Sequence, residues 1–254
     1  MPLLSVLPSR EELIMKHVLS SRILWAGVLL LSSGLASAGI TLGGTRVVLQ
    51  APSKEASILV KNQAAQDVMI QSWMEAESDS HSQDVPFAIT PPLSRLGANK
   101  QQTLRILYQG QGLQNDRESV FRLSVQEIPQ KSKSDNTLQI ALRQRIKVFY
   151  RPVGLQGTPD EAAKNLTWRL VRQGGRSVVE ATNNAAFHVS FASVKLKSAG
   201  QSYAVTADML APKSSKRFDV KDIPASASAA AMKVEFQSVN DYGGLDQHVS
   251  PLGE

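Results

Sequence analysis

The chain has no cysteine among its 254 residues, and this absence excludes several kinds of site at once. Without thiolates there is no disulfide framework, no thiolate zinc site, no iron–sulfur cluster and no cysteine nucleophile. Histidine is also scarce, and no two histidines have the spacing of metal ligands. The four are His17, His81, His188 and His248. We therefore expect no metal and no other cofactor.

Aromatic residues make up only 6% of the chain, and like charges never occur five in a row. The formal net charge of +6 is compatible with binding to nucleic acid or to anionic lipid. However, Lys and Arg are not interleaved with aromatic residues, as they are in many nucleic-acid-binding surfaces. A solvated basic surface is the better interpretation, and we expect no nucleic-acid partner.

The local motifs of catalysis are absent as well. No Gly-x-Ser-x-Gly nucleophile elbow occurs, and the glycine pairs Gly174-Gly175 and Gly243-Gly244 do not lie in a phosphate-binding pattern. The acidic residues show no pairing above chance, although sequence spacing would not reveal a carboxylate pair on a β scaffold. We therefore expect that the protein is not an enzyme.

The apolar run at residues 23–31 is too short to span a bilayer as a helix. A short basic region, Met15-Lys16-His17 with Arg22, precedes it, and Ala36-Ser37-Ala38 follows it as a small-x-small cleavage site. This order is typical of a secretory signal peptide, with a retained N-terminal anchor as the alternative. We assign residues 1–38 to a signal peptide and predict that Met15 is the true start of the protein. The mature chain from Gly39 should not insert into a membrane.

After Gly39 the chain consists of short apolar runs that turn residues interrupt about every eight to twelve residues. Seven strand candidates precede the first strong break. They are residues 45–49, 57–60, 67–73, 87–89, 103–108, 120–125 and 138–150. Strands of this length and spacing are typical of a β-sandwich of immunoglobulin type.

The break lies at Arg151-Pro152-Val153-Gly154, and Gly157-Thr158-Pro159 extends it. A second series of strand candidates follows. They are residues 166–171, 177–182, 187–191, 202–205, 217–220 and 232–239. We predict an all-β protein with two immunoglobulin-like β-sandwich domains, at residues 39–153 and 158–250.

The last candidate of the first series, which ends in Pro152, carries three large aliphatic residues on one face. Leu138, Ile140 and Leu142 alternate with Gln139, Ala141 and Arg143. An ordinary half-buried strand gives the same pattern. The alternation alone therefore predicts a strand and nothing more.

Five segments, in this order along the chain, resemble the periplasmic pilus (fimbrial) assembly chaperones. They are Thr45-Arg46-Val47, Thr90-Pro91-Pro92 with Arg95-Leu96, residues 115–121 continuing to Glu127-Ile128-Pro129, residues 138–142 with their exit at 146–152, and Asn240-Asp241-Tyr242-Gly243-Gly244. The resemblance extends over nearly the whole mature chain. It implies two immunoglobulin-like domains in an L-shaped arrangement with an interdomain cleft, and a location in the periplasm.

The resemblance further implies a chaperone that stabilises pilus subunits without ATP and delivers them to an outer-membrane usher. A pilus subunit is a sandwich that lacks its last strand, and the chaperone lends an edge strand to complete it. Chaperone–pilin complexes are themselves a standard case of this strand addition. By the resemblance, the lent strand lies in residues 138–152, and Leu138, Ile140 and Leu142 fill the subunit's groove.

The resemblance also assigns charged residues. Arg46 and Lys147 would anchor the C-terminal carboxylate of the subunit through charge-assisted hydrogen bonds. Strict alternation sets Lys147 on the face opposite the three aliphatics, so we expect a twist or a bulge to bring it into the cleft. Glu118, Arg151 and Asp241 correspond to a buried charge network that orients the domains.

Two further expectations concern assembly. The loop from Gln130 to Thr137 is short, and in this it resembles the chaperones that assemble rod-like pili. The free protein could cap its own edge as a dimer.

The alternative function is an immunoglobulin-like binding module, such as an adhesin or a structural subunit. Such a module would carry a donor extension or an aromatic-lined pocket, and neither is visible in the sequence.

Overall fold

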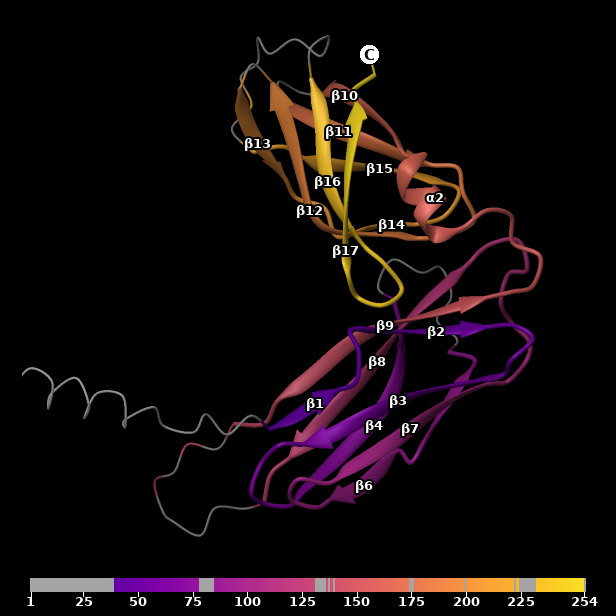
Figure 1. The fold of residues 1–254 in the computed structure, drawn as a ribbon, viewed down its shortest axis with the longest axis vertical. Coiled ribbons are helices and arrows are strands. Elements are labelled where there is room, and N and C mark those ends of the chain that lie inside the picture. Colours follow the sequence, from indigo (N-terminus) through magenta and orange to yellow (C-terminus); the bar gives the residue numbers. More distant parts are fainter. Residues whose placement is uncertain are drawn as a thin grey trace, which may run out of the picture. The chain divides into compact units, whose positions relative to one another are not determined.

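The computed structural model describes most of the chain from Gly39 onward as one compact unit. The described residues are 39–77, 85–130, 136, 138, 140–173, 176–198, 200–221, 223 and 232–253. The predicted signal peptide at 1–38 and most of the short loop at 130–137 lie outside them. Figure 1 shows that the described part consists of two β-sandwiches.

The first sandwich is made of two sheets. One has the strand order β1 (Ile40–Leu42), β3 (Glu55–Asn62), β7 (Gln101–Tyr108), β5 (Phe87–Thr90). The other has the order β2 (Arg46–Gln50), β9 (Arg143–Arg151), β8 (Ser119–Ile128), β4 (Val68–Ala76), β6 (Leu93–Leu96). All neighbouring strands are antiparallel except β2 and β9, which are parallel.

The core of this sandwich follows from the period of two along its strands. On β7, Leu104 and Ile106 are fully buried, whereas Arg105 between them is exposed. On β9, Ile146 and Val148 belong to the same core cluster. Side chains of successive residues point to opposite faces of a sheet, so one face of each sheet is apolar and the two apolar faces pack together.

The second sandwich has its own sheets and its own core. One sheet has the order β10 (Thr167–Gln173), β11 (Arg176–Asn183), β15 (Ser214–Asp219). The other has the order β13 (Gln201–Val205), β12 (Val189–Ser198), β16 (Lys233–Val239), β17 (Leu245–Pro251), and β14 (Met209–Leu210) also pairs with β12. The prediction of two all-β, immunoglobulin-like sandwiches is confirmed.

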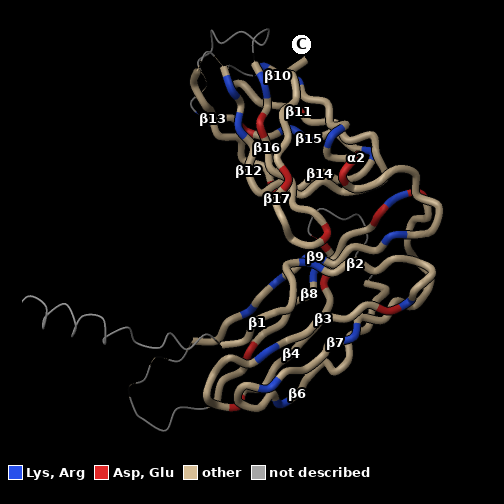
Figure 2. The backbone as a smooth tube through the Cα atoms, in the orientation of Figure 1, with Lys and Arg blue, Asp and Glu red and all other residues tan. Residues whose placement is uncertain are grey.

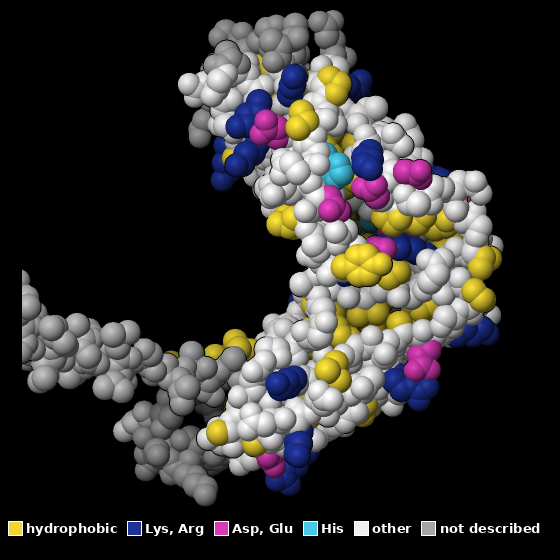
Figure 3. Space-filling view, viewed as in Figure 1, with side chains coloured by type: hydrophobic (Ala, Val, Ile, Leu, Met, Phe, Trp, Pro, Cys, Tyr) yellow, Lys and Arg dark blue, Asp and Glu magenta, His cyan; other side chains and the backbone are white. Residues whose placement is uncertain are grey.

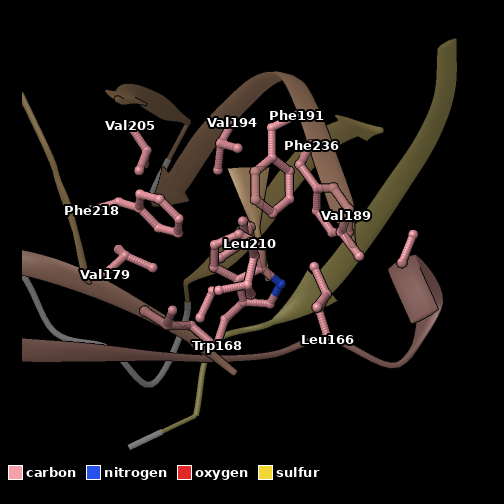
Figure 4. Packing of buried hydrophobic residues seen from close by; sticks show 14 of the residues in the cluster. Leu166, Trp168, Val179, Val189, Phe191, Val194, Val205, Leu210, Phe218 and Phe236 are labelled. Carbon is pink, nitrogen blue, oxygen red and sulfur yellow. The ribbon is translucent and has the colours of Figure 1, made fainter. Parts of the chain in front are cut away.

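Aromatic rings fill the core of the second sandwich (Figure 4). Trp168 lies with its ring centroid 5.7 Å from that of Phe191 and 5.4 Å from that of Phe236. Phe191 meets Phe218 edge to face at 6.0 Å. These offset geometries are the favoured ones for aromatic pairs and bury large apolar areas. Aromatic residues are few in the sequence, and several of them lie in this core.

One helix, α2 (Pro159–Lys164), stands where the sequence predicted only a break. Thr158 is its N-cap, and its hydroxyl accepts a hydrogen bond from the backbone amide of Glu161 at 3.2 Å. Proline at the first turn and buried Ala162 and Ala163 complete it. Threonine followed by proline at the first helical position is a helix-start signal, so a proline interpreted as a breaker in fact begins a helix.

Four strands lie outside the predicted segments, namely β1, β6, β14 and β17. The strand β17 shows the reason most clearly. Its inward positions include His248 and Ser250, which are buried although they are polar. A strand with polar residues on its inner face gives no hydrophobic alternation, so its pattern in the sequence is lost.

The predicted edge strand at 138–152 needs two corrections. Regular pairing begins at Arg143, and the described residues Leu138, Ile140 and Leu142 lie in no strand. In addition, β9 lies between β8 and β2 over residues 147–151, so only its first part has a free edge. Ahead of the strand, the carbonyl of Leu142 still accepts a hydrogen bond from the amide of Glu127 at 3.0 Å. β8, the neighbour of β9, ends at Ile128, and its last register pair with β9 is Gln126 with Arg143, so the described residues ahead of Leu142 have no adjacent strand with which to form a ladder.

Candidate functional site

Three cations stand in a row across three neighbouring strands. Lys147 on β9 is the register partner of Arg46 on β2 and of Arg122 on β8. Register partners on adjacent strands present their side chains on the same face. Around β8 and β9, positions of Lys and Arg alternate closely with positions of Asp and Glu (Figure 2). The pairing thus gathers positive charge on one face of the sheet.

Lys147 lies on the face opposite to Ile146 and Val148, as strict alternation predicts. The pairing of β8 with β9 runs without a register shift from Ser119 with Tyr150 to Gln126 with Arg143. The bulge that we expected is therefore not needed. Lys147 points away from the apolar core because its position is odd, whereas the core-facing positions of β9 are even.

The ammonium of Lys147 is largely buried, with 10% of its side chain exposed. It donates hydrogen bonds to Ser190 Oγ at 3.3 Å and to Asp208 Oδ1 at 3.1 Å. Burial lowers the pKa of Lys147, and the charge of Asp208 opposes this shift. An ammonium has three donors, so two partners leave one donor for a further acceptor.

Arg46 is held beside Lys147. Its Nη1 donates to the backbone carbonyl of Val239 at 2.7 Å, and its guanidinium lies 5.6 Å from the ring centroid of Phe149. Its Nε is buried and has no hydrogen-bond partner among the described residues. Burial lowers the pKa of Arg46, while nearby carboxylates oppose the shift. Buried donors are normally satisfied, so this guanidinium has capacity for an added acceptor.

Arg151 connects the other two residues of the predicted charge network, Glu118 and Asp241. Its Nε donates to Glu118 Oε1 at 2.7 Å, and its Nη1 and Nη2 donate to the two carboxylate oxygens of Asp241 at 2.6 and 2.7 Å. The side chains of Glu118 and Arg151 are 1% and 9% exposed. Burial alone would lower the pKa of Arg151, but its hydrogen bonds and ion pairs with both carboxylates raise it.

His188 completes this network, and sequence reasoning missed it. Glu118 Oε2 accepts a hydrogen bond from the backbone amide of His188 at 2.8 Å and lies 2.9 Å from its Nδ1. The imidazole also packs near Phe149, with 5.8 Å between ring centroids. No local motif surrounds His188 in the sequence, because its partner lies 70 positions earlier in the chain.

The three predicted groove-filling residues are exposed. The relative exposure is 86% for Leu138, 66% for Ile140 and 48% for Leu142. They have the same parity as Ile146 and Val148, so they would share the face of those residues if β9 were extended backward. Three large aliphatics in one short segment outside the core form an apolar surface of the kind that marks an interaction site.

A small cavity of about 40 Å³ lies beside the charge network. Its lining includes Arg46, Glu118, Arg151, His188 and Asp241. The space-filling view shows hydrophobic side chains bordering a hollow, with charged side chains among them (Figure 3). The cavity has room for little more than water, so it does not suit a small-molecule substrate.

The described residues contain no group of three or more His, Asp or Glu placed to hold a metal ion. No helix in the same part of the chain is long and apolar enough to cross a membrane. The chemistry of the site therefore lies in its cations, its charge network and its exposed aliphatic segment. Paired cations with free donors can bind a carboxylate, and an exposed segment beside a free strand edge can add to a sheet.

Two family models match this chain, one for each sandwich. The model described as "Pili and flagellar-assembly chaperone, PapD N-terminal domain" matches residues 39–156. The model described as "Pili assembly chaperone PapD, C-terminal domain" matches residues 161–250. Together they cover most of the chain.

Comparison with individual proteins also finds pilus-assembly chaperones. The chain is 37% identical over 216 residues to the "Probable fimbrial chaperone YadV" of Escherichia coli, covering 82% of this chain and 87% of that protein. The crystal structure of the YadV chaperone has a TM-score of 0.74 and 35% identity, over 85% of this chain and all of the other. The SafB chaperone, solved in complex with the Salmonella enterica SafA pilin, has a TM-score of 0.69 and 27% identity, over 84% of this chain and 96% of the other.

Proposed function

The chain belongs to the family of pilus-assembly chaperones, and we propose that it binds pilus subunits and stabilises them by donor-strand complementation. The family is periplasmic and its members are not enzymes. The match of both sandwiches to chaperone domains decides against the alternative of an adhesin or a structural subunit.

The exposed aliphatic segment carries this proposal. Leu138, Ile140 and Leu142 directly precede β9, whose first residues have a strand on one side only. A subunit that lacks its last strand offers an apolar groove and unpaired backbone groups, which aggregate if they stay open. Burial of an aliphatic side chain contributes roughly 1.5–3 kcal/mol. The three together would stabilise the complex by several kcal/mol beyond the backbone pairing.

Arg46 and Lys147 form the proposed anchor for the C-terminal carboxylate of the subunit. Their support is the shared register, the unpartnered Nε of Arg46 and the free donor capacity of Lys147. A carboxylate held at this point would fix the register of the added strand. Register matters because a slip by one residue would turn all three aliphatics out of the groove.

Glu118, Arg151 and Asp241 have a structural part in this proposal. Glu118 directly precedes β8 and Arg151 ends the neighbouring strand β9, whereas Asp241 comes from the turn between β16 and β17. Hydrogen bonds between charged groups are about twice as strong as those between neutral ones. We propose that this network holds the two sandwiches together and does not contact the subunit.

The remaining details of assembly are also proposals. The signal peptide at 1–38, with Met15 as its start, would export the chain, and the short loop at 130–137 would place it among the chaperones for rod-like pili. Delivery to an outer-membrane usher follows from the family's pathway. In the absence of a subunit, the exposed aliphatic segment is suited to cap a second copy, which would give a dimer.

Co-expression of the mature chain with candidate pilus subunits tests the proposal. We expect stable one-to-one complexes with the unchanged chain. Arg46→Ala and Lys147→Ala should abolish capture, while circular dichroism and thermal unfolding show that both variants fold. Lys61→Ala removes an exposed strand cation from β3 and should capture normally. Capture that survives in both anchor variants would contradict the anchoring proposal.

A further inference from the structure

The carboxylate of Asp208 rests on two of the three aligned cations. Its Oδ1 lies 3.1 Å from Lys147 Nζ, and its Oδ2 lies 3.8 Å from Arg122 Nη2. Arg122 and Lys147 are register partners on β8 and β9, so their charges are adjacent. The backbone carbonyl of Asp208 accepts a hydrogen bond from the amide of Phe191 at 2.7 Å. The sheet of the second sandwich thus fixes the residue beside the row of cations.

Asp208 and its partner differ sharply in exposure. The side chain of Asp208 is 75% exposed, whereas that of Lys147 is 10% exposed. A largely buried ammonium is unfavourable unless an anion compensates it. Asp208 is the one carboxylate within ion-pair distance of Lys147 among the described residues. Arg122, in contrast, also has both oxygens of Glu77 within hydrogen-bond distance.

We propose that Asp208 occupies, in the free chain, the position on Lys147 that a bound subunit's terminal carboxylate takes, and so sets the affinity of the site. This inference rests on the proposed function. Lys147 keeps one free donor, but a carboxylate bound there would stand beside the charge of Asp208, and because the two anions repel each other the incoming group displaces Asp208. The displaced side chain is already 75% exposed, so little of it remains to be hydrated when it leaves Lys147.

The contact lowers the affinity of the site for every carboxylate. Every carboxylate that binds Lys147 must first break the ion pair with Asp208. A free amino acid or acetate gains nothing else to offset this loss. A peptide that also pairs with β9 and buries its aliphatic side chains gains enough to displace Asp208. This shared cost leaves the ratio of the ligands' affinities unchanged, but it lowers every affinity, so a carboxylate without further contacts does not occupy the site at concentrations where the peptide does.

Asp208→Asn tests the inference, because it removes the charge and keeps the shape. The probes are a short synthetic peptide of alternating valine and threonine with a free C-terminal carboxylate, and the same peptide with a C-terminal amide. Fluorescence anisotropy measures both dissociation constants with the mature chain. We expect the preference for the acid over the amide to rise about two- to tenfold in the variant. The amide's affinity should stay the same.

Two further variants complete the design. Glu235→Gln is the control, because it removes a carboxylate that lies 3.6 Å from Lys197. Lys197 and Ser190 lie at opposite ends of β12, so this change should leave both affinities the same. In a chain that already carries Lys147→Met, Asp208→Asn should no longer raise the preference for the acid. This non-additivity would place the effect at Lys147 and not in the net charge.

The outcomes separate the two ideas. If the unchanged chain does not prefer the acid over the amide, the carboxylate anchor itself is contradicted and the inference falls with it. If the preference exists but Asp208→Asn leaves it unchanged or lowers it, only the role of Asp208 is overturned, since Asp208 would then merely position Lys147. An equal gain in affinity for acid and amide would also overturn the inference.

Discussion

Arg151 shows how a single charged residue can be both buried and stabilising. Its guanidinium forms one hydrogen bond with Glu118 and two with Asp241, so all three of its nitrogens are paired. Glu118 in turn accepts from the backbone and the ring of His188. In such a network the cost of taking charges out of water is offset only while every member is present.

Arg151→Ala should therefore lower the free energy of unfolding by about 3–5 kcal/mol, because the carboxylate of Glu118 stays buried without its cation. Arg95 is the matched control. It also pairs with an aspartate, Asp67, but its side chain is 71% exposed. Arg95→Ala should cost about 0–1 kcal/mol. Urea unfolding of both variants measures the difference, and equal losses would show that the network is not the support that we describe.

At this scale the sequence predicts some residues and not others. Five charged residues lie in segments that resemble a known family, so their roles could be proposed in advance. They are Arg46, Lys147, Glu118, Arg151 and Asp241. Asp208, Ser190 and His188 lie outside those segments. Each acts through partners that are distant in the chain, and only the contact between the two sandwiches brings them together.

Among the elements, β11 shows how cross-strand charges support a sheet. Glu180 is the register partner of Arg169 on β10 and of Arg217 on β15. Both arginines donate through Nε to its carboxylate at 2.8 Å. These hydrogen bonds, first from Arg217 and then from Arg169, lower the pKa of Glu180 below its ordinary value.

This shift predicts a sensitivity to acid. A carboxyl with a lower pKa in the folded chain stabilises the fold above its unfolded pKa, and the contribution is lost as pH falls through the folded pKa. The melting temperature should therefore fall as the pH drops below about 4.5. Glu180→Gln should make this fall shallower, and Glu235→Gln should change it less. A fall of the same steepness in Glu180→Gln would contradict the contribution of this cluster.

The strand β9 and the segment ahead of it give the second prediction at this scale. Ile140→Asp should leave the fold intact, because Ile140 is exposed and lies in no strand. It should weaken capture of a subunit by at least about 2 kcal/mol, since it removes a buried aliphatic side chain and places a charge in an apolar groove. Ala141→Asp adds the same charge at the neighbouring position, which alternation places on the opposite face.

Pull-down titrations with a captured subunit would measure both variants. Equal weakening by Ile140→Asp and Ala141→Asp would show that the segment does not bind as a strand with one face in a groove. The sequence predicted the alternation in this segment but not where regular pairing begins. The start of β9 depends on whether a neighbouring strand is present, and alternation contains no information about that.

Helix α2 and strand β17 show the same limit in other forms. Thr158 and Pro159 carry the signal of a helix start, but the helix is only six residues long and gives no period of its own. In β17, the buried His248 bonds with Ser238 on β16, with 2.8 Å between Nε2 and Oγ. A polar pair of this kind replaces the apolar alternation from which strands are predicted.

In the molecule as a whole, two separate apolar cores are joined by polar contacts. Each sandwich has its own core cluster. Hydrogen bonds between them include those from Arg46 to Val239, from Lys147 to Asp208, from Arg151 to Asp241 and between Glu118 and His188. The proposed anchor for the subunit is therefore built from the same side chains that connect the sandwiches.

This arrangement has a consequence for function. The side chains of Arg46 and Lys147 are held by partners from both sandwiches. The distance between these two cations, and so the fit of a ligand bound to them, therefore depends on both domains. The exposed aliphatic segment, in contrast, extends from one strand of the first sandwich. Strand addition and carboxylate binding are thus separate contributions, which different variants can remove one at a time.

Hydrogen–deuterium exchange at residues 138–142, measured with and without a bound pilus subunit, tests the central claim most directly. In the free chain these amides should exchange fast, since the described residues among them, 138 and 140–142, lie in no strand. In a stable complex they should become protected in alternation, because every second amide would bond to the subunit. If they exchange as fast in a stable complex as in the free chain, the segment is not a donor strand.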